Sequence, residues 1–170
     1  DPLFIDKIQD YYSDLFLVID YKIIPQDLLN IPKIGSINLH ASYLPDYKGA
    51  SPIQRALMNN DKFLGITTFF INNWIDEGNI ILQEKVKINE TITYSEAYNS
   101  LSFSGSKLMI STLKHIYKKN FKTISQTNAT KKCIYKETFS KYARKIHKDE
   151  YRINFSTSSY NLHNKIRALT

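Results

Sequence analysis

Short apolar runs separated by polar turns fill the first half of the chain, a pattern typical of strands in an open α/β sheet. The run Leu15-Phe16-Leu17-Val18-Ile19 contains no polar residue, which predicts an interior strand buried on both faces. Other runs, rich in β-branched and aromatic residues, predict strands at residues 34–39, 65–71 and 80–83. The polar stretch NNWIDEGN predicts a loop between the last two.

Helices are predicted between and after these strands, at residues 1–14, 25–32 (a turn or short helix), 52–60 and 93–117. Ser51-Pro52 begins the third of them with a capping residue and a proline at the first helical position. The longest is amphipathic, with apolar positions at Ala97, Leu101, Leu108, Ile110, Leu113 and Ile116.

The pattern changes after this long helix. From Lys118 to about Tyr142 the periodicity fades and Lys, Thr, Ser and Asn dominate, which predicts a linker. A second apolar pattern follows, in which residues 156–159 cap a helix that runs into the chain end. Its apolar residues are Tyr160, Leu162, Ile166 and Leu169.

A length of 170 residues is enough for one domain with a real core, or for one domain plus the start of another. Hydrophobic residues make up 42% of the chain, which favours a folded globular protein. No stretch approaches the roughly 20 apolar residues of a membrane span, and the N-terminus lacks a signal-peptide pattern, so we expect a soluble, cytoplasmic protein. The single cysteine, Cys133, excludes an internal disulfide.

Charge is distributed unevenly along the chain. Residues 1–113 hold 9 basic and 13 acidic residues, a net charge of −4, whereas residues 114–170 hold 14 and 3, a net charge of +11. The basic part fits contact with nucleic-acid phosphate. However, 19 of the 23 basic residues are lysine in a chain rich in Asn, Ile and Tyr, as an AT-rich genome would also produce.

Candidate chemistry lies at the carboxyl end of the predicted strand 34–39. Asn38 and His40 share one face, because side chains alternate along a strand. Open α/β sheets bind ligands at this edge, where an imidazole and an amide can stabilise an oxyanion. Asp76, in the loop before residue 80, is the best candidate for an accompanying carboxylate. On their own, a strand-end histidine is more often a structural hydrogen-bonding residue, and a loop aspartate followed by Glu-Gly is usually an ordinary turn.

The stretches INLHASYLPDYKGASPIQRALMNND and GITTFFINNWIDEGNIILQEKV resemble the formyltransferases that use 10-formyltetrahydrofolate. The family elements Asn-x-His, Ser-x-Leu-Pro, Gly-Ala-x-Pro-Ile-Gln and Asp-x-Gly fall in order at residues 38–40, 42–45, 49–54 and 76–78. Lys48 replaces a common arginine, and Glu77 and Asn79 replace frequent Thr and Asp.

The resemblance implies a Rossmann-like formyltransferase open sheet in an α/β fold, with the first strands missing, followed by a linker and the start of a C-terminal domain. It also implies catalysis by Asn38, His40 and Asp76, with 10-formyltetrahydrofolate as co-substrate and no metal. The implied folate contacts are Ser42, Tyr43, Leu44 and Pro45.

The C-terminal part carries a second resemblance. YARKIHKDEYRINF and HNKIRAL are similar to the start of the C-terminal domain in family members that formylate initiator methionyl-tRNA. The implied domains are a partial catalytic domain at 1–122, a linker at 123–142 and a partial tRNA-binding domain at 143–170. We therefore expect a chain cut at both ends, whose full-length form is a monomer.

Two alternatives remain open. Enzymes that formylate a nucleotide-linked amino sugar share the same Asn, His and Asp, so these three residues do not separate the acceptors. An inactive fragment that binds folate or RNA without turnover is also compatible with the sequence. The basic C-terminal part favours the RNA acceptor.

Overall fold

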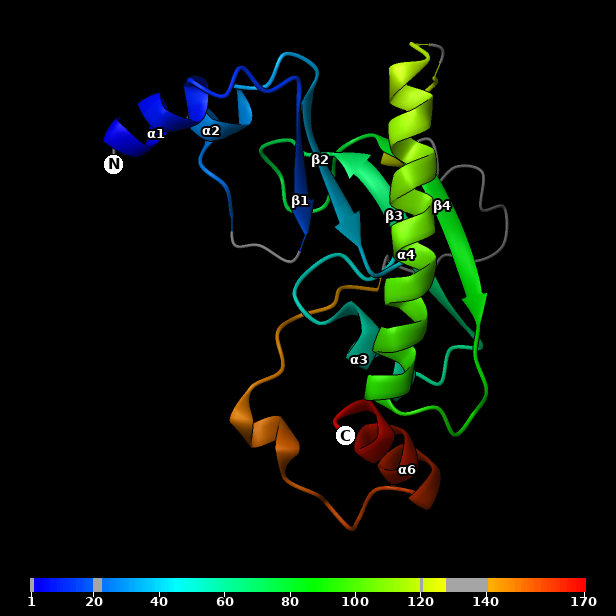
Figure 1. Cartoon of the computed structure of the whole chain (residues 1–170). Coiled ribbons are helices and arrows are strands. Elements are labelled where there is room, and N and C mark those ends of the chain that lie inside the picture. Colours follow the sequence, from blue (N-terminus) through cyan, green and yellow to red (C-terminus); the bar gives the residue numbers. More distant parts are fainter. Residues whose placement is uncertain (1, 20–22, 120, 128–140) are drawn as a thin grey trace.

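The computed structural model describes residues 2–19, 23–119, 121–127 and 141–170. A mixed sheet of four strands runs in the order β1-β2-β3-β4 (Figure 1). The strands are β1 (Leu15–Ile19), β2 (Gly35–His40), β3 (Phe63–Phe70) and β4 (Ile80–Lys87). β1 and β2 are parallel, and the other neighbouring pairs are antiparallel. The predicted α/β open sheet is thus confirmed.

The prediction that 15–19 forms an interior strand was wrong for the described part of the chain. β1 lies at the edge of the sheet and pairs with β2, and its Leu17 and Ile19 side chains are exposed. An apolar run predicts that a strand is buried, but it does not show which neighbouring strands are present to bury it. β2 and β3 are the strands with a neighbour on each side, and Ile37 of β2 is fully buried.

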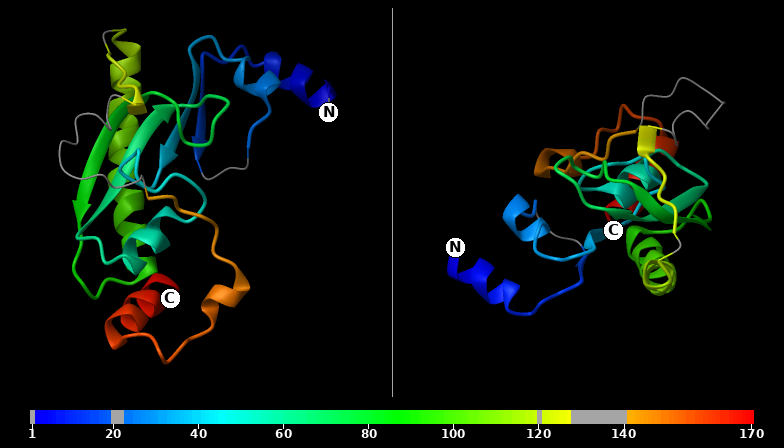
Figure 2. Two further views of the ribbon diagram at one scale, coloured as in Figure 1. Left: turned by 180° about the vertical axis from the view of Figure 1, so that it is seen from behind. Right: turned by 90° about the horizontal axis from the view of Figure 1, so that it is seen from above.

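One long helix, α4 (Tyr94–Tyr117), lies along one face of the sheet across β3 and β4 (Figures 1 and 2). It begins with a capping box, in which Thr93 and Glu96 satisfy each other's backbone N–H groups. The predicted apolar face was wrong at Ile110, which is 54% exposed. Thr112 is buried instead, because its hydroxyl bonds to the Leu108 carbonyl and the Thr68 hydroxyl.

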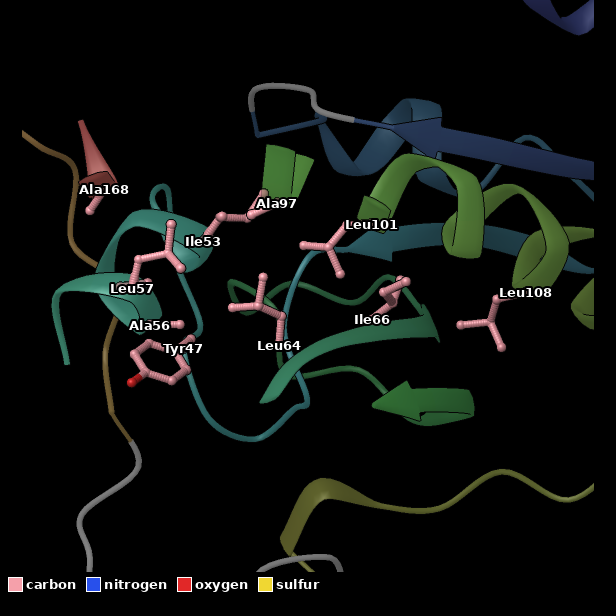
Figure 3. Close-up of a cluster of buried hydrophobic side chains, with 11 residues drawn as sticks. Tyr47, Ile53, Ala56, Leu57, Leu64, Ile66, Ala97, Leu101, Leu108 and Ala168 are labelled. Atoms are coloured by element: carbon pink, nitrogen blue, oxygen red, sulfur yellow. The ribbon is translucent and has the colours of Figure 1, made fainter. Parts of the chain in front are cut away.

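The main core lies between α4, β3 and α3 (Pro52–Met58). Figure 3 shows these side chains facing one another from the three elements. They include Ile53, Ala56, Leu57, Leu64, Ile66, Ala97, Leu101 and Leu108. Leu57 is fully buried, and removal of such a side chain typically destabilises a protein by about 2–5 kcal/mol. The core therefore fixes α3, and with it the loop that connects β2 to α3.

Short helices complete the chain: α1 (Pro2–Gln9), α2 (Gln26–Leu29), the 3-10 helix η1 (Lys148–Tyr151) and α6 (Ser159–Ala168). α6 packs against α3, although the two lie far apart in the sequence (Figure 1). Its expected apolar face was wrong at Tyr160 and Ile166, which are exposed. The buried residues of α6 are Asn164, Arg167 and Ala168. No helix in the described ranges is long and apolar enough to cross a membrane.

Arg167 explains this buried face. Its guanidinium donates to the carbonyls of Leu57 and Ile92 and to the side-chain oxygens of Asn60 and Asn164, at 2.9–3.1 Å. Because every one of these partners is an acceptor, the cation can be buried without a carboxylate. Arg167 thereby joins α6 to the end of α3 and to the turn before α4.

The start of the predicted linker contacts the sheet. Ile124 and Ile80 exchange two backbone hydrogen bonds of 2.9 Å, and the Gln126 side chain is buried. Cys133 and the central part of the predicted linker lie outside the described residues. The domain boundaries at 122 and 142 remain a prediction.

Candidate active site

His40 and Asp76 come together at the carboxyl end of β2. His40 is the last residue of β2, and Asp76 lies in the loop between β3 and β4. Their Nδ1 and Oδ2 atoms are 3.7 Å apart, and the side chains are only 10% and 16% exposed. The structure therefore places the predicted histidine beside the predicted carboxylate, at a separation too long for a direct hydrogen bond.

The other ring nitrogen of His40 contacts the protein backbone. Nε2 lies 2.9 Å from the carbonyl oxygen of Tyr47. Because a carbonyl oxygen only accepts hydrogen bonds, this contact assigns a proton to Nε2. Nδ1 is the nitrogen that faces Asp76. The hydrogen bond to the Tyr47 carbonyl sets the orientation of the ring.

Hydrogen bonds to its carboxylate and to its backbone carbonyl hold Asp76 in place. Its Oδ2 accepts a 2.8 Å hydrogen bond from the Gly49 N–H, and its carbonyl accepts one of 2.7 Å from the Gln126 side chain. Its φ of 54° lies in the left-handed region, where aspartate is tolerated better than most residues. A Cβ at Gly78 would collide with the Phe70 carbonyl, which explains the glycine of the Asp-x-Gly element.

The predicted folate segment, residues 42–45, forms a loop bound tightly to the sheet. Thr67 of β3 donates to the Ser42 carbonyl at 2.7 Å and accepts from the Leu44 N–H at 3.1 Å. Gln83 of β4 donates to the Leu44 carbonyl at 2.8 Å. Ser42 donates its hydroxyl to the Asp46 carbonyl, and the Ser42 and Leu44 side chains are only 2% and 0% exposed. These contacts fix the loop, in which the Leu44-Pro45 peptide bond is cis.

Asn38 and Asp76 line one cleft. Its remaining walls are largely apolar and come from the end of β1, the segment before α2, β3 and the loop after it. They include Val18, Ile23, Ile24, Phe69, Trp74 and Ile75. Ser42 and Tyr43 line a different pocket, next to Gly65 and Lys85. The structure thus brings two of the three predicted catalytic residues to one cleft, with His40 beside Asp76, but leaves the predicted folate residues outside it.

The sequence did not predict the hydrogen-bonding roles of several groups around this site. They are the Tyr47 carbonyl, the Gly49 N–H, Thr67, Gln83 and Gln126. The first two are backbone groups, and the other three are side chains that bind backbone groups, so no pattern of residue types marks these partners. Gly49 was visible as part of a motif, and its φ of 112° gives the physical reason for glycine there.

A strand-end histidine, a loop aspartate and an amide on one sheet edge define a candidate acyl-transfer site. A model of the formyl transferase family matches residues 1–113, and the chain therefore belongs to this family. The family resemblance drawn from the motifs is confirmed.

Two similar relatives are named methionyl-tRNA formyltransferase. That of Azobacteroides pseudotrichonymphae is 37% identical over 172 residues, covering 100% of this chain and 51% of that protein. That of Hydrogenobaculum sp. is 39% identical over 165 residues, covering 96% and 52%. The chain thus spans about half the length of the curated relatives it matches.

Solved structures of similar fold include sugar enzymes. WlaRD, a sugar 3N-formyl transferase crystallised with dTDP and 5-N-formyl-THF, is 29% identical with a TM-score of 0.72, covering 95% of this chain and 57% of that one. The N-formyltransferase of Helicobacter canadensis, in complex with folinic acid and dTDP-3-aminofucose, is 26% identical with a TM-score of 0.74, covering 95% and 58%.

Proposed function

We propose that this chain carries the catalytic centre of an enzyme that transfers a formyl group from 10-formyltetrahydrofolate to initiator methionyl-tRNA. The observation that carries the proposal is the placement of His40 Nδ1, Asp76 and Asn38 around one sheet edge. The identity of 33–39% to proteins named methionyl-tRNA formyltransferase supports the choice of acceptor. In this proposal the protein works in the cytoplasm, where charged tRNA is used.

In the proposed reaction the amine of the acceptor attacks the formyl carbon, and a C–N bond forms. The carbonyl oxygen becomes an oxyanion, which the Asn38 amide and the His40 Nδ1–H stabilise. Since Nε2 already donates to the Tyr47 carbonyl, Nδ1 donates only when His40 is an imidazolium. Asp76 takes the proton of the attacking amine and passes it to the folate nitrogen. The oxyanion then re-forms the carbonyl as the bond between the formyl carbon and that nitrogen breaks.

We place the fused ring of the folate in the largely apolar cleft beside Asn38, since flat aromatic ligands bury most of their surface in such clefts. In this proposal Ser42 and Leu44 hold the loop in place, because their side chains are buried. Tyr43 and Pro45 keep accessible side chains and remain candidate folate contacts.

A second candidate acceptor is a nucleotide-linked amino sugar, because structures of sugar formyltransferases share this fold. The acceptors differ in charge: a tRNA arm offers many phosphates and the nucleotide-linked sugar only two. Lys145, Lys148 and Arg152 are exposed in the segment that we assign to the start of the tRNA-binding domain. Salt dependence therefore separates the two acceptors.

For the full gene product that carries this chain, we expect the affinity for methionyl-tRNA to fall steeply with rising salt. The slope of the logarithm of the association constant against the logarithm of the salt concentration measures the number of phosphates that the protein neutralises. In the Lys145→Ala/Lys148→Ala/Arg152→Ala variant, we expect this slope to be less steep by about one for each lost phosphate contact. Filter binding or fluorescence anisotropy at four salt concentrations measures these slopes.

The matched control removes three exposed lysines elsewhere, in Lys7→Ala/Lys87→Ala/Lys107→Ala. We expect its slope to equal that of the parent protein. A flat salt response, or equal slopes for both triple variants, would exclude RNA contact by Lys145, Lys148 and Arg152 and favour the sugar acceptor.

A further inference from the structure

A short segment near the C-terminal part, residues 141–143, pairs with the loop between β2 and α3. We call this segment the strap. Figures 1 and 2 show the chain after residue 140 passing beside that loop. The Tyr47 N–H donates to the Lys141 carbonyl, and the Ala143 N–H donates to the Lys48 carbonyl at 2.7 Å. Ala143 is fully buried and accepts a third hydrogen bond, of 3.0 Å, from the Ser51 N–H.

The opposite side of the same loop holds the two members of the catalytic pair. The Tyr47 carbonyl accepts from His40 Nε2, and the Gly49 N–H donates to Asp76 Oδ2. Gly49 has a φ of 112°, which glycine adopts without strain. Tyr47 has a φ of 59°, in the left-handed region that residues with a side chain rarely adopt, and such a conformation persists only where surrounding contacts enforce it. The strap supplies one of these contacts, the hydrogen bond from the Tyr47 N–H to the Lys141 carbonyl.

Asp61 joins the loop to the strap. One of its carboxylate oxygens accepts from the Tyr47 hydroxyl at 2.7 Å, and the other accepts from the Lys141 ammonium at 2.8 Å. Figure 3 shows the Tyr47 ring beside α3, where Asn59 also donates to its hydroxyl. Burial raises the pKa of Tyr47 to about 12, against the effect of the Asn59 hydrogen bond, so the phenol stays neutral and remains a donor.

We propose that Asp61 is a positioning residue for formyl transfer, which acts by fastening Tyr47 and the strap together. Through Tyr47 it keeps Nε2 of His40 on a carbonyl and Nδ1 toward Asp76. No hydrogen bond or ion pair described for Asp61 involves His40 or Asp76, so its effect runs through the loop. The inference rests on the proposed function only for the roles of His40 and Asp76. The proposed role of Asp61 therefore links the C-terminal segment that precedes α6 to the positions of His40 and Asp76.

The kinetic test uses the full gene product with Asp61→Ala, and Asp61→Asn as the conservative variant. Misplacement of a catalytic group by about 1 Å can lower the rate by about two orders of magnitude, and we expect a partial release to lower kcat about tenfold. KM for the formyl donor should stay within about twofold, because the cleft beside Asn38 is untouched. Asp61→Asn keeps one acceptor for the Tyr47 hydroxyl and should recover part of kcat.

The matched control is Glu150→Ala. Glu150 forms hydrogen-bonded ion pairs with Arg55 at 2.7 and 2.9 Å, and so fastens the same C-terminal segment to α3 without touching the strap. If mere detachment of that segment lowered activity, Glu150→Ala would lower kcat as much as Asp61→Ala. We expect its kcat to match that of the parent, and an equal loss in both variants would overturn the inference.

A second measurement does not depend on activity. The chain has four histidines, so ¹⁵N-histidine NMR with His40→Ala for assignment reports which ring nitrogen of His40 carries the proton. For the neutral imidazole we expect the Nε2–H form in the parent and in Glu150→Ala, and a mixture of the two neutral tautomers in Asp61→Ala. An unchanged His40 spectrum in Asp61→Ala would overturn the inference. Failure of the parent to formylate any acceptor would instead overturn the proposed function, and the NMR result would still decide the role of Asp61.

Discussion

Replacement of His40 by alanine is expected to lower kcat for formyl transfer by two or more orders of magnitude in the full gene product, with little change in folate affinity. A hydrogen-bond donor aimed at a developing oxyanion is typically worth about that much. The neutral formyl carbonyl of the ground state needs the donor less, so kcat falls more than binding. Single-turnover kinetics together with folate titration measure the two quantities separately.

The matched control is His115→Ala on the exposed side of α4, where the ring bonds only to the Ser111 carbonyl one turn earlier. It should retain parental kcat and folate affinity. Turnover within a few-fold of the parent in His40→Ala would show that the assigned mechanism is wrong. Asn38→Ala should resemble His40→Ala, because its amide donates to the same oxyanion.

Asp76→Asn is expected to lose a comparable share of activity while the fold remains intact. The amide has the shape of the carboxylate, and its oxygen can still accept the Gly49 N–H, so the loop should keep its conformation. What disappears is the negative charge and the ability to take a proton from the attacking amine. General acid–base catalysis commonly contributes about 10²–10⁴-fold, which sets the expected loss in kcat.

Asp14→Asn provides the matching control, since Asp14 pairs with Lys33 through exposed side chains outside the cleft. Thermal unfolding of both variants should lie close to that of the parent. Retention of most of the activity in Asp76→Asn would exclude this residue as the proton acceptor. Loss of folding in Asp76→Asn would show that the charge, rather than the shape, holds the loop.

The sequence predicted the strands well because their apolar runs are local signals. Residues 34–39 were assigned correctly as the strand that ends at the site, and alternation along it placed Asn38 and His40 together on one face. The burial of Thr112 could not be predicted in this way, because its hydroxyl partner, Thr68, lies on another element. A polarity pattern treats a threonine as outward-facing whether or not a distant residue satisfies it.

Arg167 shows the same limit for a charged residue. Arginine is mostly exposed in folded proteins, so the sequence alone favours an exposed Arg167, yet it is only 4% exposed. Its carbonyl acceptors, Leu57 and Ile92, are 110 and 75 residues away, so nothing near it in the sequence indicates burial. The motif residues Asn38, His40 and Asp76 were found from the sequence, whereas the backbone groups that orient two of them were not.

In the proposed function this site formylates the amine of methionyl-tRNA. The most direct measurement incubates the full gene product with 10-formyltetrahydrofolate and follows formylation of methionyl-tRNA and of a dTDP-linked amino sugar in parallel, with His40→Ala as the blank. We predict formylmethionyl-tRNA as the product, no formylated sugar above the blank, and loss of the product in His40→Ala. Formylation of the sugar alone, or of neither acceptor, would contradict the account.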